Sequence, residues 1–323
     1  MKFHTTEKQA ALPGLEDGSR MQARRLFAQA ARLLTAANIA FALITLACAF
    51  ILLIQGRRLS GLLLEGELYS HISLIPLVSA YFLYTERRRI FSSTSPPLSE
   101  TLPGLAAFAA GLVMYAAGVI LLPFGGVSGP NDYLALLSLS AFVSWCGGFV
   151  IAFGKAAFRR AAFPVFFLLF MVPLPGFLVD ALIRILQTGS TSTAEALFSL
   201  TGAPFIREGF VFRMPGMNIE VARECSGIRS TIALIITFVA AGRLCLGEGW
   251  KRAALFIAII PVSVFKNGVR IAALSLLGIY VDERALKGPL HNYGGFLFFA
   301  LGMLMLGALL WGLSRAGRKR TGA

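Results

Sequence analysis

The sequence "VARECSGIRSTIALIITFVAA" at residues 221–241 places charged and reactive side chains directly before an apolar run. Cys225 lies between Glu224 and Ser226, and an arginine stands on either side of this group. Of the 323 residues, 56% are hydrophobic and 14% are charged, and the mean hydropathy is +0.73. A soluble domain of this length could not bury so much apolar surface. We therefore predict an integral membrane protein.

Apolar stretches with about the length needed to cross a hydrocarbon core of roughly 30 Å recur along the chain. They predict an all-α fold, a polytopic membrane helical bundle of about eight transmembrane helices. Prolines interrupt the second and the fifth stretch. The predicted spans are 33–55, 62–84, 103–123, 133–153, 161–179, 227–246, 253–279 and 293–313.

The basic residues are concentrated in every second loop. The chain has 30 Lys+Arg against 16 Asp+Glu, and "ERRR" at 86–89 is one of the basic clusters. Positive residues are retained on the cytoplasmic side of membrane proteins. We therefore assign the formal charge of +14 to orientation in the lipid bilayer and not to a nucleic-acid partner. Both termini are expected in the cytoplasm.

Three segments follow from this topology. They are a cytoplasmic N-terminal segment (1–30), a single integral membrane domain (31–314) and a basic cytoplasmic tail (315–323). The membrane domain contains a long outward-facing loop, 180–226, ahead of the sixth span.

That outer loop has local structure signals. "STAE" at 192–195 has the spacing of a capping box and predicts a short interfacial helix that ends near Gly202. "EGFVFRMPGMNIEVA" at 208–222 then predicts a small hairpin that turns at Pro215–Gly216. The hairpin would deliver the chain to Cys225.

Three reactive side chains are predicted at one face of the membrane. Counted from basic residues at the inner helix ends, Cys225 and Arg270 each lie 18 residues outward, or about 27 Å. His291 lies 24 residues from Arg315, or about 36 Å, a difference that helix tilt accommodates. A thiol, a guanidinium and an imidazole are therefore expected together near the outer surface.

This set of groups suffices for acyl transfer. A Cys225 thiolate is a nucleophile, favoured by a helix N-terminus and by the cation Arg229 at i+4. His291 exchanges protons near neutral pH, and Arg270 can hold a substrate carbonyl or a developing oxyanion. Arg223 and Arg229 are alternatives for that oxyanion role. The predicted reaction is peptide-bond cleavage through a thioester.

Structural interpretations compete with this one. A membrane cysteine is commonly a small buried hydrophobe, an arginine near a helix end commonly extends toward water, and a histidine can cap a helix. Lys266, Asn267 and Arg270 lie within about one helical turn, which favours a cavity over exposure to lipid. In a transporter for an anionic solute, the same three residues would line the path.

Three motifs carry a resemblance to a known family. "ECSGIRS" at 224–230, "NGVRI" at 267–271 and "HNYGG" at 291–295 resemble the signature blocks of the exosortase/archaeosortase family. "FPVFFLLFMVPLP" at 163–175 and "LYSHISLIPLVSAYFLYTERRR" at 68–89 are similar to further family stretches, so the resemblance covers most of the chain from about residue 60. Ile72 follows His71 where the family commonly has a glycine, so no role is assigned to His71.

The resemblance implies a membrane cysteine transpeptidase of the bacterial cytoplasmic (inner) membrane. Its substrates would be membrane-anchored exported proteins with a C-terminal sorting signal of the PEP-CTERM type: a short motif such as Pro-Glu-Pro, a transmembrane helix and a basic end. By motif, Cys225 matches the nucleophile and Arg270 and His291 match the essential arginine and histidine. A non-catalytic role in exopolysaccharide export is the remaining alternative.

Substrate-binding candidates are Arg229, Asn267, Lys266, Arg207 and Arg213, the last two for an acidic residue of the motif. Neither a metal nor an organic cofactor is expected, because the ligand spacings are absent from the sequence.

Overall fold

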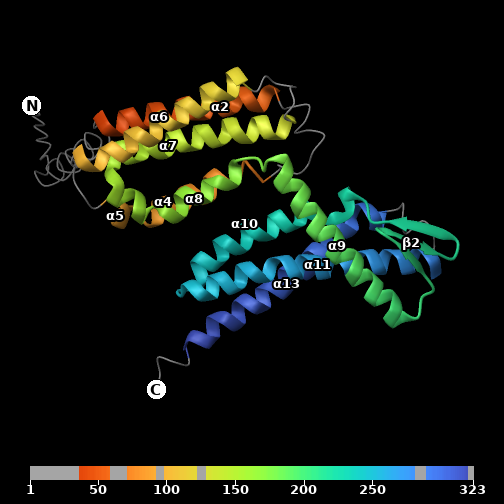
Figure 1. Ribbon diagram of the computed structural model, residues 1–323. Coiled ribbons are helices and arrows are strands. Elements are labelled where there is room, and N and C mark those ends of the chain that lie inside the picture. Colours follow the sequence, from red (N-terminus) through yellow and green to blue (C-terminus); the bar gives the residue numbers. More distant parts are fainter. Residues whose placement is uncertain (1–35, 59–70, 92–97, 122–128, 281–288, 319–323) are drawn as a thin grey trace, which may run out of the picture. The chain divides into compact units, whose positions relative to one another are not determined.

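The computed structural model describes residues 36–58, 71–91, 98–121, 129–280 and 289–318, and these are mostly helical (Figure 1). They belong to two compact units. The first comprises described segments within 36–58, 77–121 and 136–169, and the second comprises those within 71–76, 129–135 and 170–318.

The elements follow one another along the chain in this order: α2 (Ala36–Arg58), α4 (Ile75–Thr85), α5 (Arg87–Ile90), α6 (Leu98–Leu121), α7 (Pro130–Arg160), α8 (Ala162–Phe167), the 3-10 helix η2 (Leu168–Met171), α9 (Gly176–Thr201), β1 (Ile206–Glu208), β2 (Val211–Met214), β3 (Met217–Glu220), the 3-10 helix η3 (Arg223–Ser226), α10 (Ile228–Cys245), α11 (Gly249–Tyr280) and α13 (Pro289–Arg318).

Five described helices are long and apolar enough to cross a membrane, and a bent pair raises the number to six. The five lie in α6, α7, η3–α10, α11 and α13. The predicted count of eight is not confirmed. Its first two spans correspond to α2, a helix of 23 residues, and to α4, which has 11, and residues 59–70 between them lie outside the described part.

In the first unit, α2, α6 and α7 lie side by side (Figure 1). The ring of Phe41 on α2 contacts those of Trp145 and Phe153 on α7, with centroids 5.3 and 5.1 Å apart. α6 and α7 approach closely, because a Cβ on Gly111 would lie 2.2 Å from Ser144 Oγ. Small residues on α6 therefore serve packing within the chain.

The bent pair corrects the prediction for the fifth span and the outer loop. α8 with η2 ends at Met171 and α9 begins only at Gly176, so 161–179 is not one continuous helix. α9 begins at Gly176, after Pro175 in an extended conformation, and its first N–H donates to Asp132 Oδ1 at 2.6 Å. Ser192 consequently lies in the middle of a helix and does not cap one. The cap comes from a residue far away in the chain, which local sequence signals do not reveal.

A three-stranded antiparallel sheet follows α9, in the order β1-β2-β3. Met214 pairs with Met217, so Pro215 and Gly216 form the turn between β2 and β3. Strand β1 was not among the predicted elements. The sheet packs on the C-terminal parts of α9 and α11 through a cluster of buried residues: Ala194, Phe198, Ala203, Phe212, Met214, Val221, Ile271 and Ala272.

A second cluster joins α10, α11 and α13, which lie side by side in the second unit (Figure 1). Its buried members are Leu234, Phe238, Leu246, Leu255, Ile259 and Leu306. Cys225 and its neighbours in η3 lie in the chain between the sheet and this three-helix cluster.

Phe212 is the centre of the sheet cluster, fully buried and with its ring against those of Phe198 and Phe205. We expect Phe212→Ala to lower the free energy of unfolding by about 3–5 kcal/mol, because it removes buried surface and leaves a cavity. Thermal unfolding of the detergent-purified protein measures this. Ile206→Ala on β1 is the control, since Ile206 is 65% exposed. Equal melting temperatures for the two variants would contradict the assignment of this core.

Candidate active site

Cys225 lies on η3, directly before α10, and its side chain is half-buried. Its backbone N–H donates to the carbonyl of Ala222 at 3.0 Å. The next turn is left-handed at Gly227, with φ 80°, so η3 and α10 do not form one continuous helix. The expected i, i+4 relation between Cys225 and Arg229 therefore does not apply, because it requires an unbroken helix. Arg229 is exposed.

Asn267 connects the cysteine turn to two helices. Its amide NH2 donates to the carbonyl oxygen of Cys225 at 2.9 Å and to Ser190 Oγ at 3.0 Å. Asn267 is 2% exposed and Ser190 is fully buried. One side chain thus joins α9, η3 and α11. Both donor hydrogens of the predicted substrate-binding candidate Asn267 are used within the chain.

Lys266 holds the other side of the same turn. Its Nζ donates to Ser230 Oγ at 2.6 Å, and Ser230 Oγ lies 2.9 Å from the carbonyl oxygen of Gly227. The lysine is 2% exposed. Its methylene chain runs past Gly302 of α13, where an added Cβ would lie 2.9 Å from Lys266 Cδ. Buried charge of this kind is costly and needs polar partners, which Ser230 supplies.

Arg270 lies one turn beyond Asn267 on α11 and is half-buried. It interacts unfavourably with the like charge of Lys266. In the part of the chain that the structure describes, no carboxylate pairs with either cation. An arginine keeps its charge throughout the physiological pH range. Arg270 is therefore a cation on the same helix as the residue that binds the Cys225 backbone, with its hydrogen-bond donors unused among the described residues.

Three other arginines of the outer segment have carboxylate partners from this chain. Each of three predicted or alternative candidates forms such a pair: Arg207 with Glu195, Arg213 with Glu208 at 2.7 Å, and Arg223 with Asp180. The last two pairs are more than half exposed and are screened by water. Binding of a substrate carboxylate by Arg207 or Arg213 would compete with these pairs, and it stays a prediction.

The two histidines discussed in the sequence analysis, His291 and His71, lie in different elements. His291 is on the first turn of α13, and its side chain lies outside the described part of the structure. Its proximity to Cys225 stays a prediction. His71 is half-buried in a turn, where its carbonyl accepts from the N–H of Leu74 at 3.0 Å.

Sequence reasoning missed three residues around the cysteine turn: Ser190, Ser230 and Gly302. Ser190 belongs to the polar run "TGSTST" at 188–193, which had been assigned to a loop. A polar run flanked by apolar helical positions was the available signal. Ser230 stands inside the motif "ECSGIRS", but its role depends on Lys266, which is 36 residues away.

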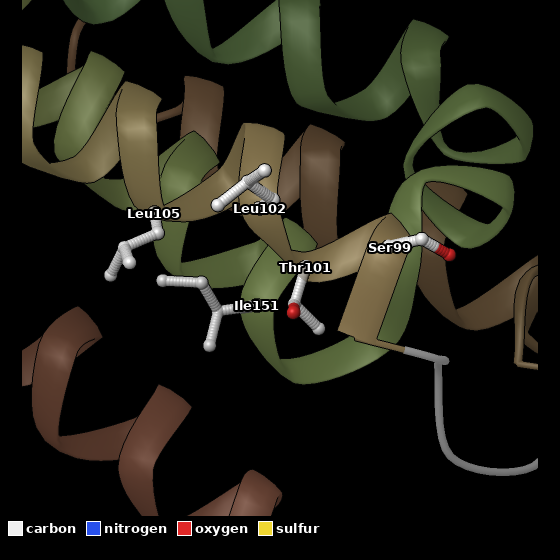
Figure 2. A pocket seen from close by; sticks show the side chains of 5 residues that line it. All are labelled: Ser99, Thr101, Leu102, Leu105 and Ile151. Atoms are coloured by element: carbon white, nitrogen blue, oxygen red, sulfur yellow. The ribbon is translucent and has the colours of Figure 1, made fainter.

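A groove on the first unit has a different character. It is lined by Ser99, Thr101, Leu102, Leu105 and Ile151 from α6 and α7 (Figure 2). None of the candidate catalytic residues lies in this groove. Its lining is mostly aliphatic, with two hydroxyl groups and no thiol, imidazole, carboxylate or basic group.

The apolar helices and the cysteine held between them define an integral membrane protein with a candidate thiol site. A family model described as transmembrane exosortase (Exosortase_EpsH) matches residues 63–308, and the chain belongs to this family. No curated protein and no solved structure matches the chain.

Gly227 is required at the cysteine turn for two reasons. Its φ of 80° is unfavourable for other residues, and an added Cβ would lie 3.1 Å from Asn267 Cγ and Oδ1. We expect Gly227→Ala to destabilise the protein by about 1–3 kcal/mol. The melting temperature of the purified protein measures this. Gly247→Ala is the matched control, since an added Cβ there meets no atom within 4 Å. Equal melting temperatures for Gly227→Ala and Gly247→Ala would contradict the expected backbone strain at position 227.

Proposed function

We propose that this member of the exosortase family is a membrane cysteine transpeptidase that cleaves the C-terminal sorting signal of exported proteins. One observation carries the proposal most directly: Asn267 binds the backbone of Cys225, and Arg270 follows one turn later on the same helix. The nucleophile and the cation are thereby tied to one rigid element. Family membership supports the same reaction class.

The reaction begins with proton transfer from the Cys225 thiol to His291. The thiolate sulfur attacks the scissile carbonyl carbon, and the oxyanion that forms is stabilised by Arg270. The C–N bond then breaks, and the amine of the released tail takes the proton from His291. A thioester joins the remaining protein to Cys225. An acceptor amine or hydroxyl, or water, attacks this thioester, releases the product and returns a proton to the thiol.

The proposed substrate is anchored by a transmembrane helix of its own. Such a helix reaches the protein laterally through the bilayer and presents the residues next to the membrane surface to Cys225. The bacterial inner membrane, with both termini of the enzyme in the cytoplasm and the site facing outward, is the proposed location. The basic clusters between the apolar segments support this orientation.

The first test is the co-expression of a membrane protein that carries a C-terminal Pro-Glu-Pro type tail. We expect wild type to remove the tail, and Cys225→Ala to lower the rate by about 10³-fold or more, because no thioester can form. Intact-mass analysis identifies the product and therefore the acceptor. Cys245→Ala is the matched control, since Cys245 is exposed at the end of α10 and is expected to be dispensable.

Two results would reject the proposal. Processing that survives the loss of Cys225 would exclude the cysteine nucleophile. Full export of polysaccharide by Cys225→Ala, without any processed protein in wild type, would favour the non-catalytic role.

Arg207 and Arg213 are proposed to bind an acidic residue of the sorting motif. Arg207 also pairs with Glu195, so a simple charge reversal would disturb the fold as well as the substrate site. We expect Arg207→Glu to reduce processing, and the exchange of both charges, Arg207→Glu with Glu195→Arg, to restore the melting temperature but not the processing. Recovery of full processing by the double variant would show that the pair is only structural.

Transport of an anionic solute is the second candidate, and the positive charges of Lys266 and Arg270 are the feature that favours it. Lys266 is 2% exposed and is bonded to Ser230 of its own chain, which suits a structural role better than a solute path. Accumulation of an anionic solute that persists in Cys225→Ala would support transport over peptide cleavage.

A further inference from the structure

Asn267 has a position that the proposed chemistry does not explain by itself. It is buried on α11, and its amide NH2 donates both hydrogens to oxygen atoms of the same chain, the Cys225 carbonyl and Ser190 Oγ. A residue that only bound substrate would keep a donor available. Asn267 therefore acts on the backbone that carries the Cys225 thiol.

The other side-chain restraints on the turn act at its two ends and not at Cys225 itself: Arg223 pairs with Asp180, and the hydroxyls of Ser230 and Thr231 donate to the Gly227 carbonyl. η3 is a short 3-10 turn, a conformation with poor hydrogen-bond geometry. The hydroxyl of Ser226, the next residue, is fully buried and has no hydrogen-bond partner among the described residues, so it does not fix the turn. On the far side, Gly227 is held by Ser230 and Lys266. On the near side, the Asn267 amide is the side-chain donor to the Cys225 carbonyl.

The same hydrogen bond sets a distance. Arg270 follows Asn267 by three residues, which is about 4.5 Å along a rigid helix. Because Asn267 binds the backbone of Cys225, it fixes the height of Arg270 relative to the cysteine. α9 and α11 also approach each other closely beside Asn267, since an added Cβ on Gly268 would lie 2.4 Å from Thr193 Cβ. α9 and α11 are therefore closely packed next to the Asn267 bond, with no room for a side chain at position 268.

We propose that Asn267 is a positioning residue: with Ser190 as its anchor on α9, it holds the Cys225 turn in register with Arg270. The inference rests on the proposed function for its catalytic consequence. Its structural part, the restraint on Cys225, can be measured without any substrate.

The substrate-free test measures alkylation of Cys225 by N-ethylmaleimide in membranes. The full-length chain is used with Cys48, Cys146 and Cys245 replaced by alanine, so that Cys225 is the only thiol. Asn267→Leu keeps the branched shape at Cγ and removes both donors. We expect it to raise the alkylation rate at pH 7 about tenfold, because the half-buried turn is released. Asn218→Leu, on an exposed position of β3, is the matched control and is expected to react as the parent does.

The catalytic test separates positioning from substrate binding. At saturating substrate, Asn267→Leu is expected to lower the single-turnover rate about 100-fold, since a displacement of about 1 Å has effects of this size. The apparent substrate affinity should change less than about threefold. A loss confined to affinity would overturn the proposal and assign Asn267 to substrate binding.

Ser190→Ala keeps the inference testable if Asn267→Leu does not fold. This substitution keeps the hydrogen bond from Asn267 to the Cys225 carbonyl and removes the bond to α9. We therefore expect the alkylation rate of Cys225 to rise about threefold and the single-turnover rate to fall about threefold. Ser275→Ala is its control, because Ser275 is similarly buried and, among the described residues, its hydroxyl donates within α11 to the carbonyl of Ile271. Alkylation rates equal to the parent's in both Asn267→Leu and Ser190→Ala would overturn the proposal. Changed alkylation with no processing by the parent would instead retain the restraint and reject the proposed function.

Discussion

The hydrogen bonds of the Asn267 amide are the interaction on which the organisation of the site depends. They connect Asn267 to Cys225 and Ser190, which lie 42 and 77 positions away in the chain. Asn267 and Ser190 are buried, and Cys225 is half-buried. In such surroundings an unpaired donor or acceptor is costly, so loss of one partner disfavours the whole arrangement. The nucleophile-bearing turn is thereby coupled to the packing of two helices.

The length and composition of the apolar runs predicted α6, α7, α10, α11 and α13, because these two properties determine whether a helix can span a membrane. The same reasoning failed for α8 and α9. Two prolines suggested an interruption, but the direction of the chain after it depends on Asp132, which meets Gly176 only in the folded protein. Strand β1 was missed because it has three residues and no alternation to reveal it.

The sequence motifs were a better guide to which residues belong to the site than to the role of each residue in it. Cys225 and Arg270 were selected by their heights and by family resemblance, and the structure describes their surroundings without testing the catalytic roles. Asn267 was grouped with the cations as a substrate ligand. Its hydrogen bonds are determined by how α9 lies against α11, and Ser190 carried no signal of that contact in the sequence. Long-range pairs of this kind cannot be inferred from spacing.

The cap on α9 has a consequence for biosynthesis. The chain leaves the ribosome from its N-terminal end, so Asp132 is made before Gly176, the residue whose N–H it accepts. The helix that follows the prolines is therefore synthesised with its capping carboxylate already present. A circular permutation that places the segment from Pro175 onward first would reverse this order, and α9 would be synthesised before the carboxylate that caps it.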